Sequence, residues 1–160
     1  MYIRHATLSD LEQIAFVEAA CFPPAEAASK ESFRKRLEVY PEHFWLLCED
    51  ETIIGFVNGM VSRSADLTDA MYDEAHLHDG EGDWQMIFGV NTLPEYRCRG
   101  YAEKILNQVI FDAGQQGRKG LVLTCKERLI HYYAKFGFIN EGISESVHGQ
   151  AVWYQMRLTF

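Results

Sequence analysis

The stretch VNTLPEYRCRGYAEKIL, residues 90–106, decides which fold the chain adopts. It ends an apolar run that begins at Trp84, and it then starts a helix with an apolar face. Two arginines precede Gly100 in the turn, and Ala102 follows two positions later. A helix start exposes free backbone N–H groups and the positive end of the helix dipole, which together attract an anion. This turn is therefore a candidate anion cradle.

Spacing alone leaves two interpretations of the cradle open. Because Gly100 has no side chain, a ligand such as a diphosphate can approach the backbone closely. Equally, Gly100 can be an ordinary turn glycine between solvated arginines. The three-glycine dinucleotide fingerprint is missing, and no Gly-Lys-Ser/Thr triplet follows, so neither a dinucleotide site nor a P-loop is indicated.

The composition is that of a globular domain. The chain has 160 residues, 48% of them apolar and 13% aromatic, which suits one substantial core. No apolar run is long enough to span a membrane and no signal-like segment begins the chain, so we expect a cytoplasmic protein. A net charge of −8 argues against nucleic-acid binding and is compatible with a cationic substrate, although acidity also serves solubility.

The cysteines and histidines give no indication of a metal. The four cysteines lack the spacing of a zinc site or a redox pair, so we expect them to be reduced, with Cys48 and Cys125 in core strands. His76 and His78 lie two apart, as metal ligands on an extended segment can, but no partner cluster accompanies them. We therefore expect no metal.

The apolar patterns and turn residues predict an α/β fold with a mixed sheet, as a single domain over residues 1–160. Strands are expected at 2–6, 43–49, 52–62, 84–93, 121–125, 138–142 and 150–159. Helices are expected at 9–21, with a capping box of Ser9 and Glu12, and at 29–40, 100–116 and 128–136. Residues 64–83 are strongly acidic and are expected to form a surface loop with room for one helical turn.

Two motifs resemble those of the GCN5-related N-acetyltransferases (GNAT superfamily). Arg97, Gly100 and Ala102 match that family's acetyl-CoA-binding pattern, Arg/Gln-x-x-Gly-x-Gly/Ala. About thirty residues later, IHYYAKFGF, residues 130–138, resembles the family's closing motif Tyr-x-Lys-x-Gly-Phe, which begins here at Tyr133. The resemblance covers nearly the whole chain, because the order of expected helices and strands fits as well.

This resemblance implies an acetyl-CoA-dependent N-acetyltransferase whose mixed sheet is split at the strand of residues 84–93 and flanked by helices. Backbone groups of that strand would hold the pantetheine arm, and the N–H groups of the turn would hold the pyrophosphate. The implied cofactor-binding residues are Val90, Asn91, Thr92, Arg97, Cys98, Arg99, Gly100, Tyr101, Ala102 and Glu103.

A closer resemblance is to the serotonin (arylalkylamine) N-acetyltransferase branch. It is carried by residues 21–38, 51–59, 123–138 and 147–156. The branch implies a small primary amine as substrate. Its vertebrate members carry two histidines on the strand before the acetyl-CoA motif, but the corresponding residues here are Met86 and Phe88, which cannot carry a proton. The implied substrate-binding residues are Phe22, Pro23, Pro24, Glu26, His148 and Trp153.

Acetyl transfer to an amine needs a neutral amine, a donor for the carbonyl oxygen and a proton for the leaving thiolate. Tyr133 is the candidate general acid, because a tyrosine is ordinarily protonated at neutral pH, and a core-packing tyrosine is the alternative. The adjacent Tyr132 is expected to face elsewhere. By family analogy, a Val90 or Asn91 N–H would serve the carbonyl oxygen. The proton acceptor stays open among Glu26, Glu74, His76, His78, His148 and a chain of water molecules.

Two alternatives to a small-amine acetyltransferase remain at this stage. The missing histidines suit a non-catalytic acyl-CoA-binding or sensor domain. The acidic segment 64–83 suits a polycation, so a polyamine, an antibiotic or a protein N-terminus is a possible acceptor. Either a monomer or a homodimer is compatible with the sequence.

Overall fold

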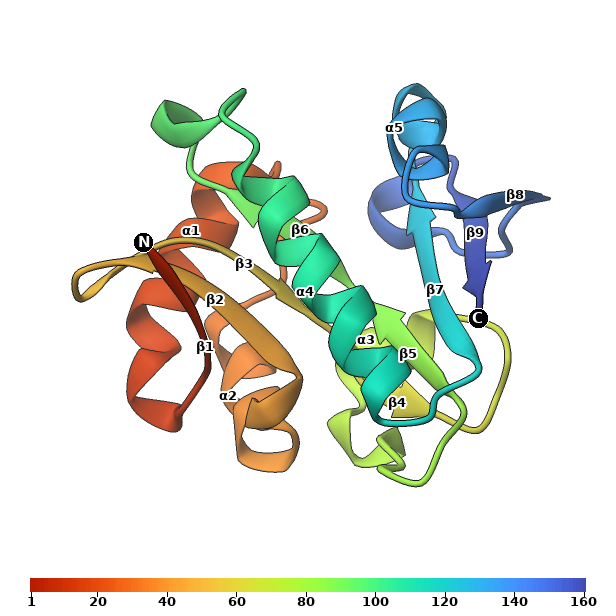
Figure 1. Ribbon diagram of the computed structural model, residues 1–160, viewed down its shortest axis with the longest axis horizontal. Coiled ribbons are helices and arrows are strands. Elements are labelled where there is room, and N and C mark those ends of the chain that lie inside the picture. Colours follow the sequence, from red (N-terminus) through yellow and green to blue (C-terminus); the bar gives the residue numbers. More distant parts are fainter. The chain divides into compact units, whose positions relative to one another are not determined.

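The computed structural model describes residues 1–160 as an α/β fold with two sheets (Figure 1). Its contacts group the chain into two units: the first is Met1–Gly59 with Gly89–Val109, and the second is Met60–Phe88 with Ile110–Phe160. The expected split of the mixed sheet at residues 84–93 is confirmed. The expected strand is interrupted at Phe88, and the two shorter strands on either side of it belong to different sheets.

The first unit contains a four-stranded antiparallel sheet in the order β1-β2-β3-β6. Its strands are β1 (Tyr2–His5), β2 (Phe44–Glu49), β3 (Thr52–Asn58) and β6 (Gly89–Thr92). Helix α1 (Leu11–Cys21) packs on β3 and β6, and α2 (Lys30–Val39) packs on α1. Phe33 from α2 lies edge-on to Phe44 and Phe56, with ring centres 6.2 and 5.8 Å apart. All three rings are fully buried, and burial of each contributes roughly 1.5–3 kcal/mol.

The start of α1 differs from the expected capping box. Thr7, rather than Ser9, precedes a turn of 3-10 helix, and its backbone N–H donates to the Asp10 carboxylate at 2.8 Å. The same carboxylate accepts from Arg4 Nη1 at 2.9 Å and from Arg4 Nη2 at 2.7 Å, and these bonds hold the pKa of Asp10 below its usual value. The sequence pattern predicted the cap two residues too late, because it does not show that Asp10 pairs with Arg4 of β1.

The second unit contains a five-stranded sheet in the order β4-β5-β7-β9-β8. Its strands are β4 (Val61–Ser62), β5 (Trp84–Ile87), β7 (Gly120–Cys125), β8 (Ile139–Ile143) and β9 (Tyr154–Thr159). Only the β5–β7 pair is parallel. Two short helices, α3 (Asp69–Asp73) and α5 (Ile130–Ala134), accompany this sheet, and α4 (Tyr101–Gln115) begins in the first unit and ends in the second.

Several elements are shorter than the apolar patterns predicted. The expected strand 52–62 breaks between Asn58 and Val61, and the last strand begins at Tyr154 because a turn with Gly149 at φ +63° precedes it. Segment 64–83 contains α3 and a 3-10 turn (Ala75–Leu77). All four cysteines are free. None of the helices combines the length and the apolar character that a membrane crossing requires.

Candidate functional site

Strand β6 leaves one edge without a partner strand in its sheet. Leu93 donates its N–H to the Ile54 carbonyl of β3 at 2.9 Å, whereas the Thr92 carbonyl accepts from Arg97 Nε at 3.1 Å and from Cys21 Sγ at 3.2 Å. Backbone groups alternate in direction along an antiparallel strand, so the Val90 N–H and C=O also face away from β3. Val90 therefore presents a free donor and a free acceptor at the edge of the first sheet.

The turn after β6 ends in an unshielded helix start. Cys98 and Gly100 both have positive φ values, +62° and +79°, and space around a side chain added at Gly100 is open to at least 4 Å. The first helical hydrogen bond of α4 runs from the Lys104 N–H to the Gly100 carbonyl at 3.1 Å. The amides of residues 101–103 therefore precede the helical ladder, as an anion cradle requires.

The side chains of Arg97 and Arg99 both contact residues of the turn or of the strand end before it. Arg97 bonds back to the Thr92 carbonyl, so its side chain closes the strand end. The Arg99 guanidinium lies 5.6 Å from the centre of the Tyr96 ring, whose hydroxyl donates to Glu49 at 3.3 Å. The nearby Glu49 carboxylate raises the pKa of Tyr96. The sequence shows two arginines in this turn, but it could not predict that Arg97 is tied to β6.

Buried polar side chains converge on Gly89, the first residue of β6. A Cβ added at Gly89 would lie 3.3 Å from Asn91 Nδ2 and 3.9 Å from both Asn58 Nδ2 and Glu18 Oε1. Asn91 is fully buried, and its Oδ1 has no hydrogen-bond partner. Glu18 is 6% exposed, and its Oε2 accepts from the Ala28 N–H at 2.9 Å. Sequence reasoning missed Glu18, although a carboxylate among the apolar residues of α1 was a visible signal.

The segment after α1 carries four of the predicted substrate-binding residues. Phe22 and Glu26 are half-buried, whereas Pro23 and Pro24 are exposed. The Pro23 carbonyl accepts from the Glu26 N–H at 2.9 Å, so the segment forms a tight turn. Glu18 is linked to this segment through Ala28, which brings one buried carboxylate close to the predicted amine-binding stretch.

Tyr133 lies in the core of the second unit. Its side chain is 8% exposed, and its ring is edge-on to Phe138 with centres 6.1 Å apart. Burial, with smaller contributions from Cys125 and Tyr132, raises the pKa of Tyr133. Its hydroxyl therefore stays protonated well above neutral pH. Tyr132 is less buried, and its ring packs against that of Phe136 with ring centres 5.4 Å apart.

The structure brings His148 and Trp153 together in an aromatic cluster of the second unit. Trp153 Nε1 donates to the His148 carbonyl at 2.7 Å, and their ring centres are 6.1 Å apart. Tyr72 from α3 lies between His148 and Phe88, with ring centres 5.1 and 4.8 Å away. Sequence reasoning missed Tyr72, because nothing local distinguishes it within an acidic segment.

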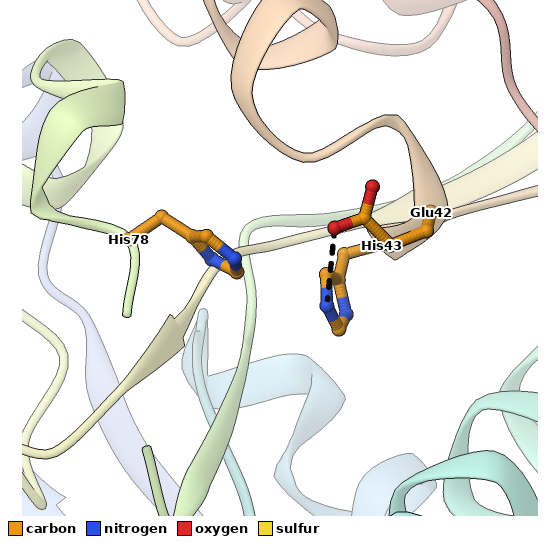
Figure 2. A group of neighbouring side chains, drawn as sticks. All are labelled: Glu42, His43 and His78. Carbon is orange, nitrogen blue, oxygen red and sulfur yellow. Dashed lines mark ion pairs between the residues drawn. The ribbon is translucent and has the colours of Figure 1, made fainter. Parts of the chain in front are cut away.

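The other expected proton acceptors are less suitable. Glu74 and His76 are exposed, and Glu74 Oε1 lies 4.0 Å from His76 Nε2. His78 Nδ1 accepts the Val61 N–H at 3.0 Å within the second unit, so that nitrogen is occupied. Figure 2 shows the ring of His78 and, in the first unit, the 3.9 Å pair between His43 Nε2 and Glu42.

A protein-family model described as the acetyltransferase (GNAT) family matches residues 7–138. No curated protein matches the chain. Among solved structures, the GphF GNAT-like decarboxylase in complex with isobutyryl-CoA is 21% identical, with 99% of each chain covered and a TM-score of 0.83.

Two further solved structures are similar. The loading GNATL domain of CurA from Lyngbya majuscula is 16% identical, with 99% of this chain and 96% of that chain covered and a TM-score of 0.85. The ribosomal-protein-S18-alanine N-acetyltransferase from Escherichia coli is 17% identical, with 99% and 92% covered and a TM-score of 0.73. At these identities, the similarities show the fold alone.

Proposed function

This chain belongs to the acetyltransferase (GNAT) family, and on that premise we propose that it transfers the acetyl group of acetyl-CoA directly to a small primary amine, with residues 1–160 acting as one catalytic domain. The observation that carries the proposal is the helix start after Gly100, where positive φ, open space and free amides coincide. A diphosphate is the anion that matches such a cradle in this family.

The free edge of β6 supports a site for the pantetheine arm beside the cradle. Val90 offers both an N–H and a C=O there, whereas the Thr92 carbonyl is already occupied by Arg97 and Cys21. The Asn91 N–H faces β3, which leaves the Val90 N–H as the better donor to the acetyl carbonyl oxygen. Acetyl-CoA supplies the activated thioester, and these residues hold and polarise it.

Tyr133 is the proposed general acid. Its raised pKa keeps the phenol protonated, so it can donate to the leaving thiolate. We expect Tyr133→Phe to lower kcat roughly 100-fold while acetyl-CoA affinity stays unchanged, because only a proton donor is lost. Tyr132→Phe is the matched control and should keep its kcat. A Tyr133→Phe enzyme with wild-type turnover across the whole pH range would show that the phenol is not the acid.

Glu18 is the proposed partner of the substrate ammonium. It is a buried carboxylate beside Gly89, and it is linked to the Phe22–Glu26 turn through Ala28. A buried carboxylate is stabilised by a cation, and the exposed prolines with Phe22 suit a flat apolar group beyond that cation. An arylalkylamine has both features, so we favour it as the substrate.

A screen of amines tests the proposal. Tryptamine, spermine and a short peptide are compared at equal concentration, with free CoA as the readout and acetylated product identified by mass spectrometry. Preferred acetylation of tryptamine supports the arylalkylamine. Preferred acetylation of spermine or of the peptide replaces it with a polyamine or a protein N-terminus. Tight acetyl-CoA binding without any turnover would favour a sensor domain.

Decarboxylation of an acyl-CoA is the second candidate function. It is favoured by the similarity to a GNAT-like decarboxylase over 99% of both chains. The same screen, run with a carboxylated acyl-CoA and no amine, distinguishes it, because a decarboxylase releases carbon dioxide and keeps the thioester intact.

A further inference from the structure

Gly89, the first residue of β6, is a strand glycine that its own backbone does not require. Its φ is not in the positive range, unlike that of Gly100. A Cβ added at Gly55 or Gly120, in two other strands, would come within 2.6 or 1.9 Å of a backbone atom, whereas at Gly89 the nearest atom is Asn91 Nδ2 at 3.3 Å. A glycine weakens a strand and is typical of places where a ligand approaches the backbone closely. Gly89 therefore marks a candidate place for part of a ligand.

The space beside Gly89 is walled by polar side chains from three elements of the first unit. Asn58 of β3 is paired with Gly89 and shares its face of the sheet, as does Asn91 two residues along β6. Asn58 Nδ2 and, from α1, Glu18 Oε1 each lie 3.9 Å from a Cβ added at Gly89. Gly89 is half-buried, so solvent reaches part of it. One carboxylate and two amides thus surround the position of the side chain that glycine lacks.

The side-chain amide of Asn91 is held on one arm only. Its Nδ2 donates to the Phe56 carbonyl at 3.4 Å, which is a long hydrogen bond. Its Oδ1 is fully buried and has no hydrogen-bond partner. Burying an acceptor without a partner is costly, and such a group in a folded protein calls for an explanation. A ligand group that donates a hydrogen bond would satisfy Asn91 Oδ1.

The side-chain amide of Asn58 is oriented by a buried cation. Asn58 Oδ1 accepts from Arg36 Nη1 at 2.9 Å, and both residues are almost fully buried. Because the oxygen of this amide is bound to the guanidinium, its Nδ2 is turned away from Arg36 and lies beside the space at Gly89. Together, Asn58 and Asn91 place N–H donors and one unsatisfied acceptor beside the same glycine.

We propose that this space binds a hydroxyl group next to the amine, so that the substrate is a 2-amino alcohol, and that Asn91 is the residue that selects it. The inference rests on the proposed acetyltransferase function, in which Glu18 pairs with the ammonium. A hydroxyl both donates and accepts, so it matches the Asn91 acceptor together with an amide donor, whereas a hydrocarbon matches neither. In a 2-amino alcohol the nitrogen and the oxygen are on neighbouring carbons, which suits a carboxylate and an amide beside one glycine.

Two substrates that differ by one hydroxyl test the proposal in the whole chain. They are 2-phenylethylamine and 2-amino-1-phenylethanol, which share the ring and the amine, and the readout is release of free CoA. We expect the wild-type kcat/KM to be roughly 10- to 100-fold higher for the amino alcohol, because 2-phenylethylamine leaves a buried acceptor unsatisfied. One enantiomer of the amino alcohol should be preferred, because the Glu18 carboxylate, the Asn91 amide and the turn at Phe22 define three separate contacts.

Three variants test the roles through the ratio of the two kcat/KM values, since a loss of stability or of acetyl-CoA binding lowers both values alike. Asn91→Leu, which has a similar shape and no polar arm, should bring the ratio to about one. Thr92→Val is the matched control and should keep the ratio, because Thr92 Oγ1 is also buried without a hydrogen-bond partner but belongs to the opposite face of β6.

Gly89→Ala places a methyl group in the proposed hydroxyl space and should also lower the ratio. This variant should still fold, because the atom nearest to the methyl is the end of the flexible Asn91 side chain. Its far-UV circular dichroism should match that of the wild type.

The outcomes that overturn the inference differ from those that overturn the proposed function. Equal kcat/KM values for the two substrates in the wild type, or an unchanged ratio in Asn91→Leu, would overturn the inference and leave the proposed function standing. The Kd of each amine for the complex with CoA, measured by calorimetry, gives the same preference without turnover. Tighter binding of the amino alcohol without any acetylation would overturn the proposed function and keep the assignment of the hydroxyl space. A protein that neither binds nor acetylates either amine would overturn both.

Discussion

A side chain at Gly100 faces two separate penalties. Its φ of +79° is a conformation that costs an L residue about 1 kcal/mol, and a carboxylate at this helix start would repel a diphosphate. We expect Gly100→Glu to raise the Kd for CoA roughly 100-fold or more, which corresponds to about 2.8 kcal/mol, as measured by calorimetry.

Gly117 offers a matched control for this change. It has nearly the same φ, +78°, and the space around it is equally open to 4 Å, but it follows the end of α4 instead of preceding its start. Gly117→Glu should lose a similar amount of stability and keep its affinity for CoA. Equal losses of affinity in both variants would mean that Gly100 is only a turn glycine.

Cys125 makes stability depend on pH in the alkaline range. Burial raises the pKa of its thiol to about 11, whereas an unfolded cysteine titrates near ~8.5. The folded chain keeps this proton longer, so the contribution is complete below the unfolded value and is lost as pH rises through the folded one. Between these two pKa values, the free energy of unfolding measured in urea should fall less steeply with rising pH in Cys125→Ala than in the wild type. Cys98→Ala, with an exposed thiol, should decline like the wild type.

At the scale of elements, the Asp69 carboxylate joins α3 to the turn before β9 by hydrogen bonds, beside the ring contact between Tyr72 and His148. Asp69 accepts from both the Ser146 hydroxyl and the Val147 N–H. We expect Asp69→Ala to destabilise this turn by roughly 1–3 kcal/mol, because the buried Ser146 hydroxyl and the Val147 N–H both lose their acceptor. Hydrogen exchange of residues 144–150 should become faster, whereas Asp73→Ala, on the same helix, should leave it unchanged. Unaltered exchange in Asp69→Ala would show that the turn is ordered without this carboxylate.

Elements with local causes could be predicted from the sequence, and contacts between distant elements could not. Ser29 caps α2 through the Ser32 N–H at 3.1 Å, and Gly137, at φ +102°, ends the turn after α5, as their residue types suggest. The helix start at Gly100 is equally local. The contacts of Tyr72 could not be predicted, because they are made with Thr124 and His148, which lie 52 and 76 positions away in the chain.

On the scale of the whole molecule, neither unit is a continuous segment of chain. The chain passes between them after Gly59, after Phe88 and after Val109, and the last of these points lies inside α4. Unfolding of either unit would therefore disrupt helix α4, which the two units share, and would remove the structure that flanks the segments of the other unit. We expect the protein to unfold in urea in one cooperative transition.

The three tryptophans allow this prediction to be measured in each unit. Trp45 is fully buried in the first unit, and Trp84 and Trp153 belong to the second. Fluorescence of Trp45→Phe therefore reports the second unit, and fluorescence of the double variant Trp84→Phe with Trp153→Phe reports the first. Within each variant, the fluorescence midpoint should coincide with the midpoint from far-UV circular dichroism, which reports both units. A fluorescence transition that precedes the dichroism transition would mean that the unit it reports unfolds independently, in spite of the shared helix.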